Sequence, residues 1–335
     1  MKLELARRSL HLREPLITAY GSVSDRELLE VRLTGQDGHV GIGEAAPLEP
    51  YDGVSLDAVQ AQVEACADVP LGDRAATLEA CRAHCSLPQA LAGIDLALWD
   101  LDGRRAGRPV TTLLSDEPAP EVTVNALIGV GLSDGAEQAR AAVAAGFRTL
   151  KVKVGDPDDL ERVALVRAAV GPNVALRVDA NGAWSVPESV ERLRRLAEHE
   201  IELCEEPVHG VAELRAVRQA LDGGVRIAMD ETADEPGALE SGAADAVCLK
   251  IARCGGISGT LDAARAARAA GADVYLASTL DGPAGIAAAL HVVAALHIER
   301  ACGLATLALF ADCADPFPVR DGAIPVPEGP GLGVG

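Results

Sequence analysis

Lysine is almost absent from this 335-residue chain, and aromatic residues are nearly as scarce. Phe, Tyr and Trp together make up 2% of the sequence, so Ala, Val and Leu must fill the core. Such a composition favours regular packing of helices on strands. Arginine supplies most of the positive charge, and among the 30 basic residues the lysines are Lys2, Lys151, Lys153 and Lys250. Lysine differs from arginine because its ammonium can lose its proton near neutral pH.

Other absences limit the partners of the protein. The formal net charge of -20 leaves no basic surface for nucleic acid. The charged start of the chain, Met1–Glu4, does not resemble a signal peptide, and no apolar run reaches the ~18 residues of a membrane span. The eight cysteines form no CxxC pair and no compact disulfide spacing. We therefore predict a cytoplasmic protein with reduced thiols, no nucleic-acid or membrane partner, and a homo-oligomeric state.

Residues 1–115 have the pattern of a self-contained α+β unit, in which strands are followed by helices. The strands are expected at 2–12, 27–34 and 38–44, and the helices at 55–66, 74–85 and 87–105. The segment Ile17–Ser24 contains glycine and several hydroxyl residues, so it reads either as a mobile loop or as an ordinary strand connection.

From residue 121 onward, apolar strand-like runs alternate with amphipathic helical segments. The runs lie at 121–130, 149–155, 175–180, 202–208, 226–230, 246–252, 272–278 and 302–309. The segments lie at 134–145, 157–170, 187–199, 211–221, 258–270 and 283–294. This alternation predicts parallel strands with crossover helices, and we expect a (β/α)7β TIM-type barrel over 118–312, since no convincing helix follows the last run. The Pro/Gly-rich tail, 313–335, is expected to return to the 1–115 unit and complete a capping domain.

Charged residues and one asparagine stand at the ends of five successive predicted strands, which follow one another at intervals of 20 to 26 residues. They are Lys151 and Lys153, Asp179 and Asn181, Glu205 and Glu206, Asp230 and Glu231, and Lys250. Taken singly, each acid reads as a helix cap or a solvated strand end. Taken together, they meet at one mouth of the barrel, where catalytic groups of such barrels lie. Carboxylates without His or Cys ligands suit Mg²⁺.

The ordered set of motifs resembles the enolase superfamily, and within it the muconate lactonizing enzyme subgroup. Besides those strand ends, the set includes Gly43-Glu44-Ala45-Ala46-Pro47, the junction 92–101 and the stretch 250–256. The resemblance implies that Asp179, Glu205 and Asp230 bind Mg²⁺, with Mn²⁺ as a substitute. It also implies that Lys153 and Lys250 face the substrate from opposite sides and that Lys151 supports Lys153.

The chemistry implied by this resemblance is removal of a proton α to a carboxylate, through an enediolate stabilised by the metal. Lys153 is the expected base, and Lys151 and the ion should favour its neutral amine. The end of the seventh strand, Ala277-Ser278-Thr279, has no histidine, which argues against a base of the mandelate racemase type. Further residues are expected either to contact the substrate or to contact the side chains that bind it. They are Asn181, Glu231, Ser278, Thr279, Thr18 and Tyr20.

The substrate is a small carboxylate, and several reactions remain open. The pattern Gly303-Leu304-Ala305-Thr306 looks most like o-succinylbenzoate synthases, so dehydration of that type is the first expectation. Dipeptide epimerases carry an Asp-x-Asp pair near this point, which the chain lacks. Dipeptide epimerisation or N-acylamino acid racemisation is the alternative, followed by muconate cycloisomerisation. A barrel that binds a carboxylate without turnover is the non-enzymatic alternative.

Overall fold

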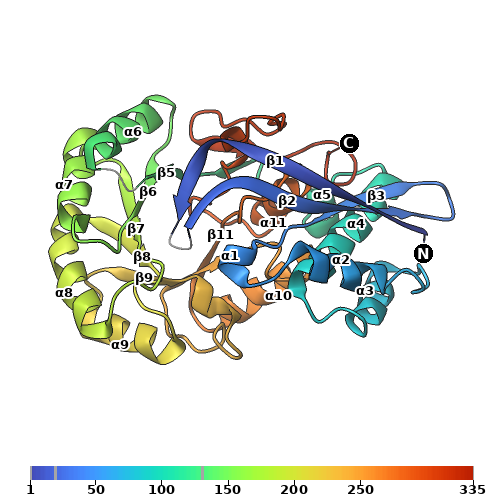
Figure 1. Ribbon diagram of the computed structural model, residues 1–335, viewed down its shortest axis with the longest axis horizontal. Helices are drawn as coiled ribbons and strands as arrows, with labels where there is room; N and C mark the ends of the chain where they lie inside the picture. The colour runs from blue at the N-terminus through green and yellow to red at the C-terminus, as the bar shows by residue number, and fades with distance from the viewer. Residues whose placement is uncertain (1, 19–20, 130–131, 335) are drawn as a thin grey trace.

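The computed structural model describes residues 2–18, 21–129 and 132–334. A three-stranded antiparallel sheet, β1-β2-β3, lies beside a curled seven-stranded parallel sheet with the order β11-β10-β9-β8-β7-β6-β5 (Figure 1). Helices α6 to α9 line the outer side of the parallel sheet, as expected for crossover connections. The predicted α/β class, a barrel-type sheet with an N-terminal antiparallel capping region, is confirmed.

The capping sheet is dominated by a long hairpin of β1 (Lys2–Thr18) and β2 (Gly21–Thr34), followed by β3 (Val40–Ala45). Alternate residues of β2, such as Leu29, Val31 and Leu33, are fully buried, which is the period of two expected for a sheet with one covered face. The first two predicted strands are shorter than β1 and β2, whereas the third, 38–44, begins two residues before β3 and ends one residue before it. Of the segment 17–24, residues 17–18 end β1 and residues 21–24 begin β2. Tyr20 lies outside the described residues.

Five helices complete the N-terminal region: α1 (Glu49–Asp52), α2 (Leu56–Glu64), α3 (Arg74–Arg82), α4 (Pro88–Ala106) and α5 (Val110–Leu114). The side chains of Ser55 and Asp73 cap α2 and α3 by accepting backbone N–H groups. Helix α4 packs directly on β3, where a Cβ at Gly43 would stand 2.0 Å from the Gly93 carbonyl oxygen. The three long helices predicted for this region are confirmed to within three residues at their ends.

The parallel sheet and its helices agree closely with the predicted alternation. The strands are β5 (Ala126–Ile128), β6 (Thr149–Lys153), β7 (Ala175–Asp179), β8 (Ile201–Glu205), β9 (Arg226–Met229), β10 (Ala246–Leu249) and β11 (Asp273–Leu276). The helices are α6 (Leu132–Ala144), α7 (Asp159–Val170), α8 (Val186–Leu196), α9 (Val211–Leu221), α10 (Gly256–Ala269) and α11 (Pro283–Ala295). Short 3-10 turns lie at η1 (Ala197–His199) and η2 (Glu231–Asp234). None of the described helices combines the length and the apolar character that crossing a membrane requires.

The predicted eighth strand, 302–309, is wrong except at its start. Cys302 and Gly303 make single bridges to Val124 and Ala277, which joins the two ends of the sheet. The chain then leaves the sheet and forms η3 (Leu307–Leu309). Directly after η3, Phe310 makes a single antiparallel bridge to Leu12 of β1.

The predicted first run, 121–130, is divided into two strands. Its first part, β4 (Glu121–Thr123), pairs with β12 (Ala323–Pro325) rather than with the barrel sheet. Only the second part, β5, joins the parallel sheet.

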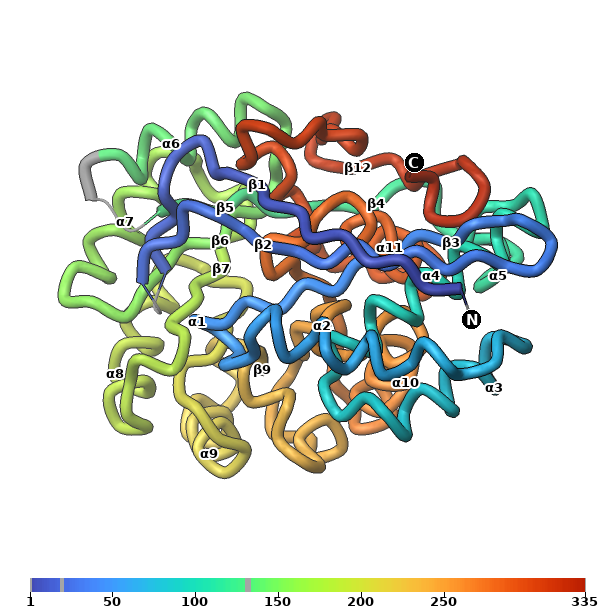
Figure 2. Tube along the Cα trace, turned by 45° about the vertical axis from the view of Figure 1, so that its right-hand side comes forward, coloured from blue at the N-terminus to red at the C-terminus, as the bar shows by residue number. Residues whose placement is uncertain are grey.

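The tail after residue 312 runs back along the molecule toward the N-terminal helices (Figure 2). The Leu332 amide donates a 2.7 Å hydrogen bond to the buried carboxylate of Asp100 on α4, and the Val110 amide donates to the Gly331 carbonyl at 2.9 Å. We propose on this basis that 1–115 and 313–335 form one capping domain and that 118–312 forms the barrel.

Candidate active site

Strand register brings three of the predicted residues into one row. Lys153 of β6 pairs with Asp179 of β7, and Asp179 pairs with Glu205 of β8. Parallel strands in this register end at one level, so their last side chains share one edge of the sheet. Both carboxylates are almost fully buried, with 1% exposure each. Buried carboxylates are costly unless cations stand beside them.

The lysines of β6 supply that positive charge. The Lys151 ammonium lies 2.9 Å from Asp179 Oδ2 and donates to Glu205 Oε1 at 2.5 Å. Lys153 donates to Asp179 Oδ2 and to Asn181 Oδ1, both at 2.6 Å. Burial opposes the charge of Lys151, but Asp179 and Glu205 outweigh it and raise its pKa. Burial likewise opposes the charge of Asp179, but Lys151 and Lys153 hold its pKa well below the usual range.

Lys250 lies across the barrel mouth in a different environment. It follows β10, which β7, β8 and β9 separate from β6, and its ammonium donates to Asp230 Oδ1. The Tyr51 ring of α1 lies 5.2 Å from Lys250 Nζ. Burial is the main cause that lowers the pKa of Lys250 to about 7, with nearby Arg253 acting in the same direction. The two sides of the site thus differ, since Lys151 retains its proton more firmly than Lys250.

Two residues at the strand ends adopt left-handed backbone conformations, Asn181 with φ 44° and Glu206 with φ 40°. Such conformations are uncommon outside glycine and concentrate at functional sites. Asn181 Nδ2 donates to Glu231 Oε1 at 3.0 Å, so Glu231 holds the amide that contacts Lys153. Glu206 turns away from Glu205, and its carboxylate accepts the Asp230 amide at 2.7 Å. Burial raises the pKa of Glu206 to about 7.

The three predicted metal ligands fit a hard divalent cation by their chemistry. Asp179, Glu205 and Asp230 offer carboxylate oxygens at adjacent strand ends, which Mg²⁺ prefers. Ligand atoms of Glu205, Asp230 and Cys248 come within 4.8 Å of one another, whereas Asp179, paired with two lysines, is outside that group. Burial raises the pKa of Cys248 well above its usual value, so this thiol stays protonated and is a poor ligand.

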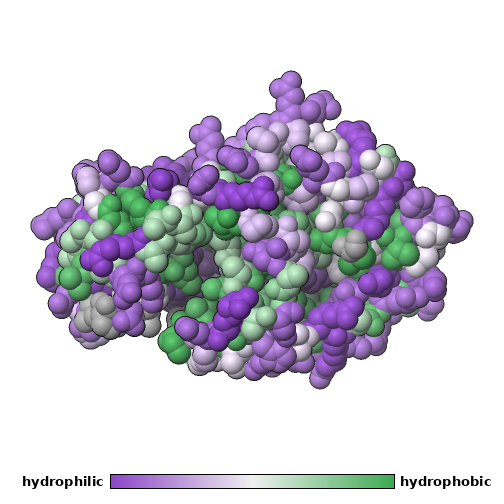
Figure 3. Space-filling model, turned by 90° about the horizontal axis from the view of Figure 1, so that it is seen from above, coloured by the Kyte–Doolittle hydropathy of each residue, from purple (hydrophilic) through white to green (hydrophobic). Residues whose placement is uncertain are grey.

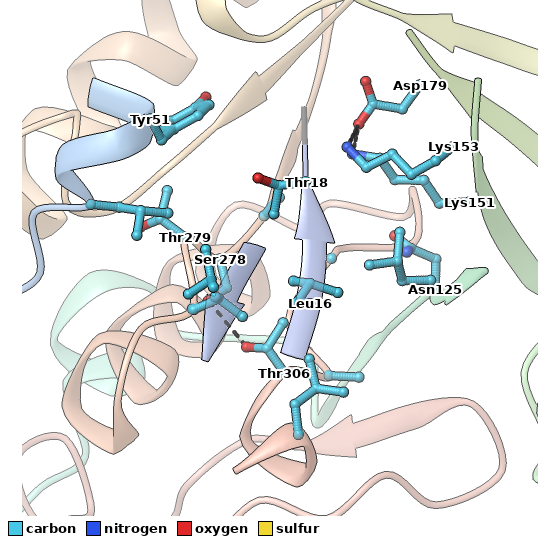
Figure 4. Close-up of a pocket in the computed structure, with 18 of the residues that line it drawn as sticks. Leu16, Thr18, Tyr51, Asn125, Lys151, Lys153, Asp179, Ser278, Thr279 and Thr306 are labelled. Carbon is cyan, nitrogen blue, oxygen red and sulfur yellow. Dashed lines mark hydrogen bonds and ion pairs between the residues drawn. The ribbon is translucent and has the colours of Figure 1, made fainter. Parts of the chain in front are cut away.

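A cavity of about 350 Å³ opens above these charges, between the β1–β2 hairpin and the barrel mouth. Figure 3 shows the molecule from above, hollowed on this face and bordered by hydrophobic atoms. In Figure 4, Lys151, Lys153 and Asp179 lie on one side of the cavity, and Tyr51, Ser278 and Thr279 lie on the other.

The predicted further contacts divide into two groups. Of these residues, the cavity wall includes Thr18, Asn181, Ser278 and Thr279. Glu231 is not part of that wall and reaches the site through Asn181.

The sequence-based prediction gave no role to three contributors. Tyr275 of β11 donates to Glu205 Oε2 at 2.6 Å. Tyr51 lines the cavity beside Lys250, and Glu206 orients the Asp230 backbone. Two of these contributors are tyrosines, and the whole chain has only three tyrosines. The rarity of tyrosine was therefore a signal in the sequence, as the rarity of lysine was.

Comparisons with known families cover nearly the whole chain. Residues 2–115 match the family described as mandelate racemase / muconate lactonizing enzyme, N-terminal domain. Residues 134–335 match the family described as enolase C-terminal domain-like. The first match covers the antiparallel sheet and its helices, and the second covers most of the parallel sheet together with the tail.

Two relatives illustrate the similarity. A hydrophobic dipeptide epimerase of Roseobacter litoralis is 32% identical over 301 residues, which cover 87% of each chain. An o-succinylbenzoate synthase of Mycobacterium tuberculosis is 46% identical over 193 residues, 54% of this chain and 57% of the relative.

Solved structures agree over the full length. The dipeptide epimerase from Enterococcus faecalis, solved with Mg and the dipeptide L-Leu-L-Tyr, superposes with a TM-score of 0.90 at 27% identity and covers 99% of this chain and 98% of its own. The N-succinyl Arg/Lys racemase from Bacillus cereus gives 0.91 at 26% identity, covering 99% and 94%. The chain therefore belongs to the enolase superfamily, in its muconate lactonizing enzyme subgroup, and is an enzyme of that superfamily.

Proposed function

We propose that the protein racemises or epimerises the α-carbon of an amino acid whose nitrogen is held in an amide, as in an N-acylamino acid or a dipeptide. The observation that carries this proposal is the pair of lysines at one cavity, Lys153 after β6 and Lys250 after β10, with three strands between them. Moving a proton from one face of a carbon to the other requires a group on each face.

The relatives support this reaction better than dehydration, which was the first expectation from the sequence. Relatives aligned over 87% or more of the chain are named dipeptide epimerases, whereas the o-succinylbenzoate synthase match spans about half of it. The intact lysines and buried acids also argue against a barrel that only binds.

Each lysine has a defined task. For one enantiomer, the neutral amine of Lys153 takes the α-proton and the Lys250 ammonium returns a proton to the opposite face. For the other enantiomer the roles are exchanged, and proton exchange with water restores the starting state. Lys151, held by Asp179 and Glu205, keeps its charge on the same strand as Lys153.

Asp179, Glu205 and Asp230 would hold Mg²⁺ at the floor of the cavity. When bound there, the ion would stabilise negative charge on the substrate carboxylate as a Lewis acid. Function with Mn²⁺, self-association and a cytoplasmic location stay predictions.

The test is exchange of the α-proton in deuterated water with Mg²⁺ present, followed by NMR from each enantiomer of an N-acylalanine separately. We expect deuterium incorporation together with inversion from both enantiomers. Exchange without inversion would indicate one working base and overturn the two-base proposal. No exchange with any N-acylamino acid or dipeptide would overturn the function itself.

Dehydration of the o-succinylbenzoate synthase type is the second candidate. The observation in its favour is the 46% identity to the Mycobacterium tuberculosis enzyme, in an alignment half the length of the chain. Incubation with the cyclohexadiene carboxylate precursor separates the two candidates, because a dehydratase gives the aromatic product, detectable by its ultraviolet absorbance.

A further inference from the structure

The upper edge of the cavity carries exposed apolar side chains that the proposed reaction does not use. Among the described residues, the large hydrophobic side chains left exposed are Ile17 at 57%, Leu127 at 41%, Leu165 at 41% and Leu309 at 36%. All except Leu165 line the cavity. We refer to Ile17, Leu127 and Leu309 as the apolar rim.

The rim is built from three separate parts of the chain. Ile17 is the penultimate residue of β1, Leu127 lies in β5 and Leu309 ends η3. Two of these elements are joined directly, because the Arg13 guanidinium donates to the Ala308 carbonyl at 3.1 Å. Exposed apolar groups that converge on a cavity mark a surface that a ligand covers.

The cavity wall also includes uncharged polar side chains. They include Thr18, Asn125, Ser278, Thr279 and Thr306, and Thr306 Oγ1 donates to Ser278 Oγ at 3.1 Å. Groups of this kind suit a neutral amide, which both donates and accepts hydrogen bonds.

Charge is confined to the floor. Among the described residues of the cavity wall, the carboxylates are Asp179 and Asp230, both engaged by lysines, and no arginine is present. Residues 19 and 20, outside the described part, are Ala and Tyr and add no formal charge at neutral pH. An ammonium or a second carboxylate on the acyl group would therefore find no free charged partner in this wall and would pay a desolvation cost. The Arg13 guanidinium next to Leu309 lies outside the wall and is engaged by the Ala308 carbonyl.

We infer that the natural substrate is an amino acid acylated with an uncharged apolar group, and that the acyl chain lies against the apolar rim. This inference rests on the proposed function, and it narrows that function to substrates without the free ammonium of a dipeptide or the distal carboxylate of an N-succinyl group.

Binding of ligands without an α-proton tests the inference separately from catalysis. The matched pair is 4-methylpentanoyl-α-aminoisobutyrate and L-leucyl-α-aminoisobutyrate, which share one carbon skeleton and differ by the ammonium. N-acetyl- and N-succinyl-α-aminoisobutyrate complete the set, and dissociation constants are measured by calorimetry with Mg²⁺ present.

We expect the 4-methylpentanoyl ligand to bind about 10-fold or more tightly than the leucyl and succinyl ligands. It should also exceed the acetyl ligand by about four-fold for each methylene that the rim covers. A second series, N-acetyl amino acids with lengthening side chains, should show a smaller dependence. Three results would overturn the inference. The first is an affinity that depends only on the length of the amino acid side chain, the second is tightest binding of the leucyl ligand, and the third is no binding of any ligand.

Rim variants supply the second test. Ile17→Ser, Leu127→Ser and Leu309→Ser should each lower the preference for 4-methylpentanoyl over acetyl about three- to ten-fold. Leu165→Ser is the matched control, because Leu165 is as exposed as Leu127 but lies on α7 away from the cavity, and it should leave the preference unchanged. An unchanged preference in all three rim variants contradicts the inference.

Misfolding could weaken binding of the ligands in a variant, but it would not tighten binding of one of them, so the last variant is designed to gain affinity. Leu309→Asp should tighten binding of the leucyl ligand relative to the 4-methylpentanoyl ligand, since it gives the ammonium a partner. If Leu309→Asp leaves that ratio unchanged, Leu309 does not face the acyl group. Should no substrate show α-proton exchange while this binding order holds, the proposed reaction fails and the selectivity of the cavity stands.

Discussion

The floor and the rim of the cavity are built in opposite ways. The floor consists of six charged side chains at the barrel mouth, each held by at least one ion pair: Asp179, Glu205, Asp230, Lys151, Lys153 and Lys250. The three carboxylates and Lys250 are buried. The rim consists of exposed leucine and isoleucine side chains from a hairpin, a short strand and a 3-10 turn. Ion pairs hold the floor side chains in place, whereas a substitution in the rim leaves those ion pairs unchanged. Reaction type and substrate choice are therefore separable in this molecule.

The largest expected effect comes from the floor. Lys153→Arg keeps a positive charge but cannot titrate near neutral pH, so α-proton exchange should fall about 10³-fold for the enantiomer whose proton faces Lys153. The measurement is deuterium incorporation by NMR. Lys2→Arg is the control, since Lys2 is 68% exposed and forms an ion pair with Glu4 at the start of β1. Exchange at the wild-type rate in Lys153→Arg would mean that the base has been misassigned.

The second prediction divides the floor into its two sides. Lys250→Arg should reduce exchange about 10²-fold or more from the opposite enantiomer and leave exchange from the first enantiomer largely intact. Chiral chromatography of the products should show retention rather than inversion. Equal loss from both enantiomers would contradict a one-face role for Lys250. Persistent dehydration of the cyclohexadiene substrate in this variant would favour the second candidate function.

The third prediction concerns the acids of the floor. Asp230→Asn removes a proposed ligand that is also the partner of Lys250. Loss of a residue that only hydrogen-bonds to a metal ligand typically lowers metal affinity ~10–100-fold, and the fall in Mg²⁺ affinity should be larger here. Calorimetric titration with Mg²⁺ measures this directly. An unchanged affinity would remove Asp230 from the metal site.

The fourth prediction tests a support beneath the floor. Tyr275→Phe deletes the hydrogen bond to Glu205 Oε2 without changing the shape of the side chain, and affinity for Mg²⁺ should fall about 10-fold. Urea unfolding of the variant shows whether stability has changed as well. Mg²⁺ affinity equal to that of the wild type would limit Tyr275 to packing.

The smallest expected effect on activity lies where the capping sheet meets the barrel, and the quantity that should change there is the stability of the fold. Glu44 of β3 accepts the Gly282 amide at 2.7 Å, and Asp281 and Arg26 lie nearby. Burial, followed by repulsion from Asp281, raises the pKa of Glu44 to about 8. Between pH 4.5 and 8 the folded protein then holds a proton that the unfolded chain releases, so stability falls as pH rises, by at most ~1.4 kcal/mol per pH unit.

Glu44→Gln keeps an acceptor for the Gly282 amide and removes this proton. The fall in the free energy of unfolding over that pH range should therefore become smaller, as measured by urea unfolding at several pH values. An identical pH profile in the variant and the wild type would show that Glu44 does not titrate in this range.

The floor could be predicted from the sequence, and the rim could not. Lys153, Asp179 and Glu205 recur at the spacing of one strand and helix, so the barrel alone brings them together. Ile17, Leu127 and Leu309 have no such spacing. Their convergence depends on the hairpin reaching over the barrel and on the chain leaving the sheet after Gly303, where a continued strand was expected.

The hydrogen bond between Asp100 and Leu332 has a consequence for how the protein is made. Its two residues are 232 positions apart, so at about 5–20 residues per second a ribosome adds Leu332 roughly 10–50 s after Asp100. Throughout that interval Asp100 can bond to Ile42 and Arg104, but its second carboxylate oxygen lacks the Leu332 amide. A fragment of residues 1–115 should therefore unfold over a broad, uncooperative transition. A sharp transition in that fragment would show that the N-terminal region matures before synthesis of the tail.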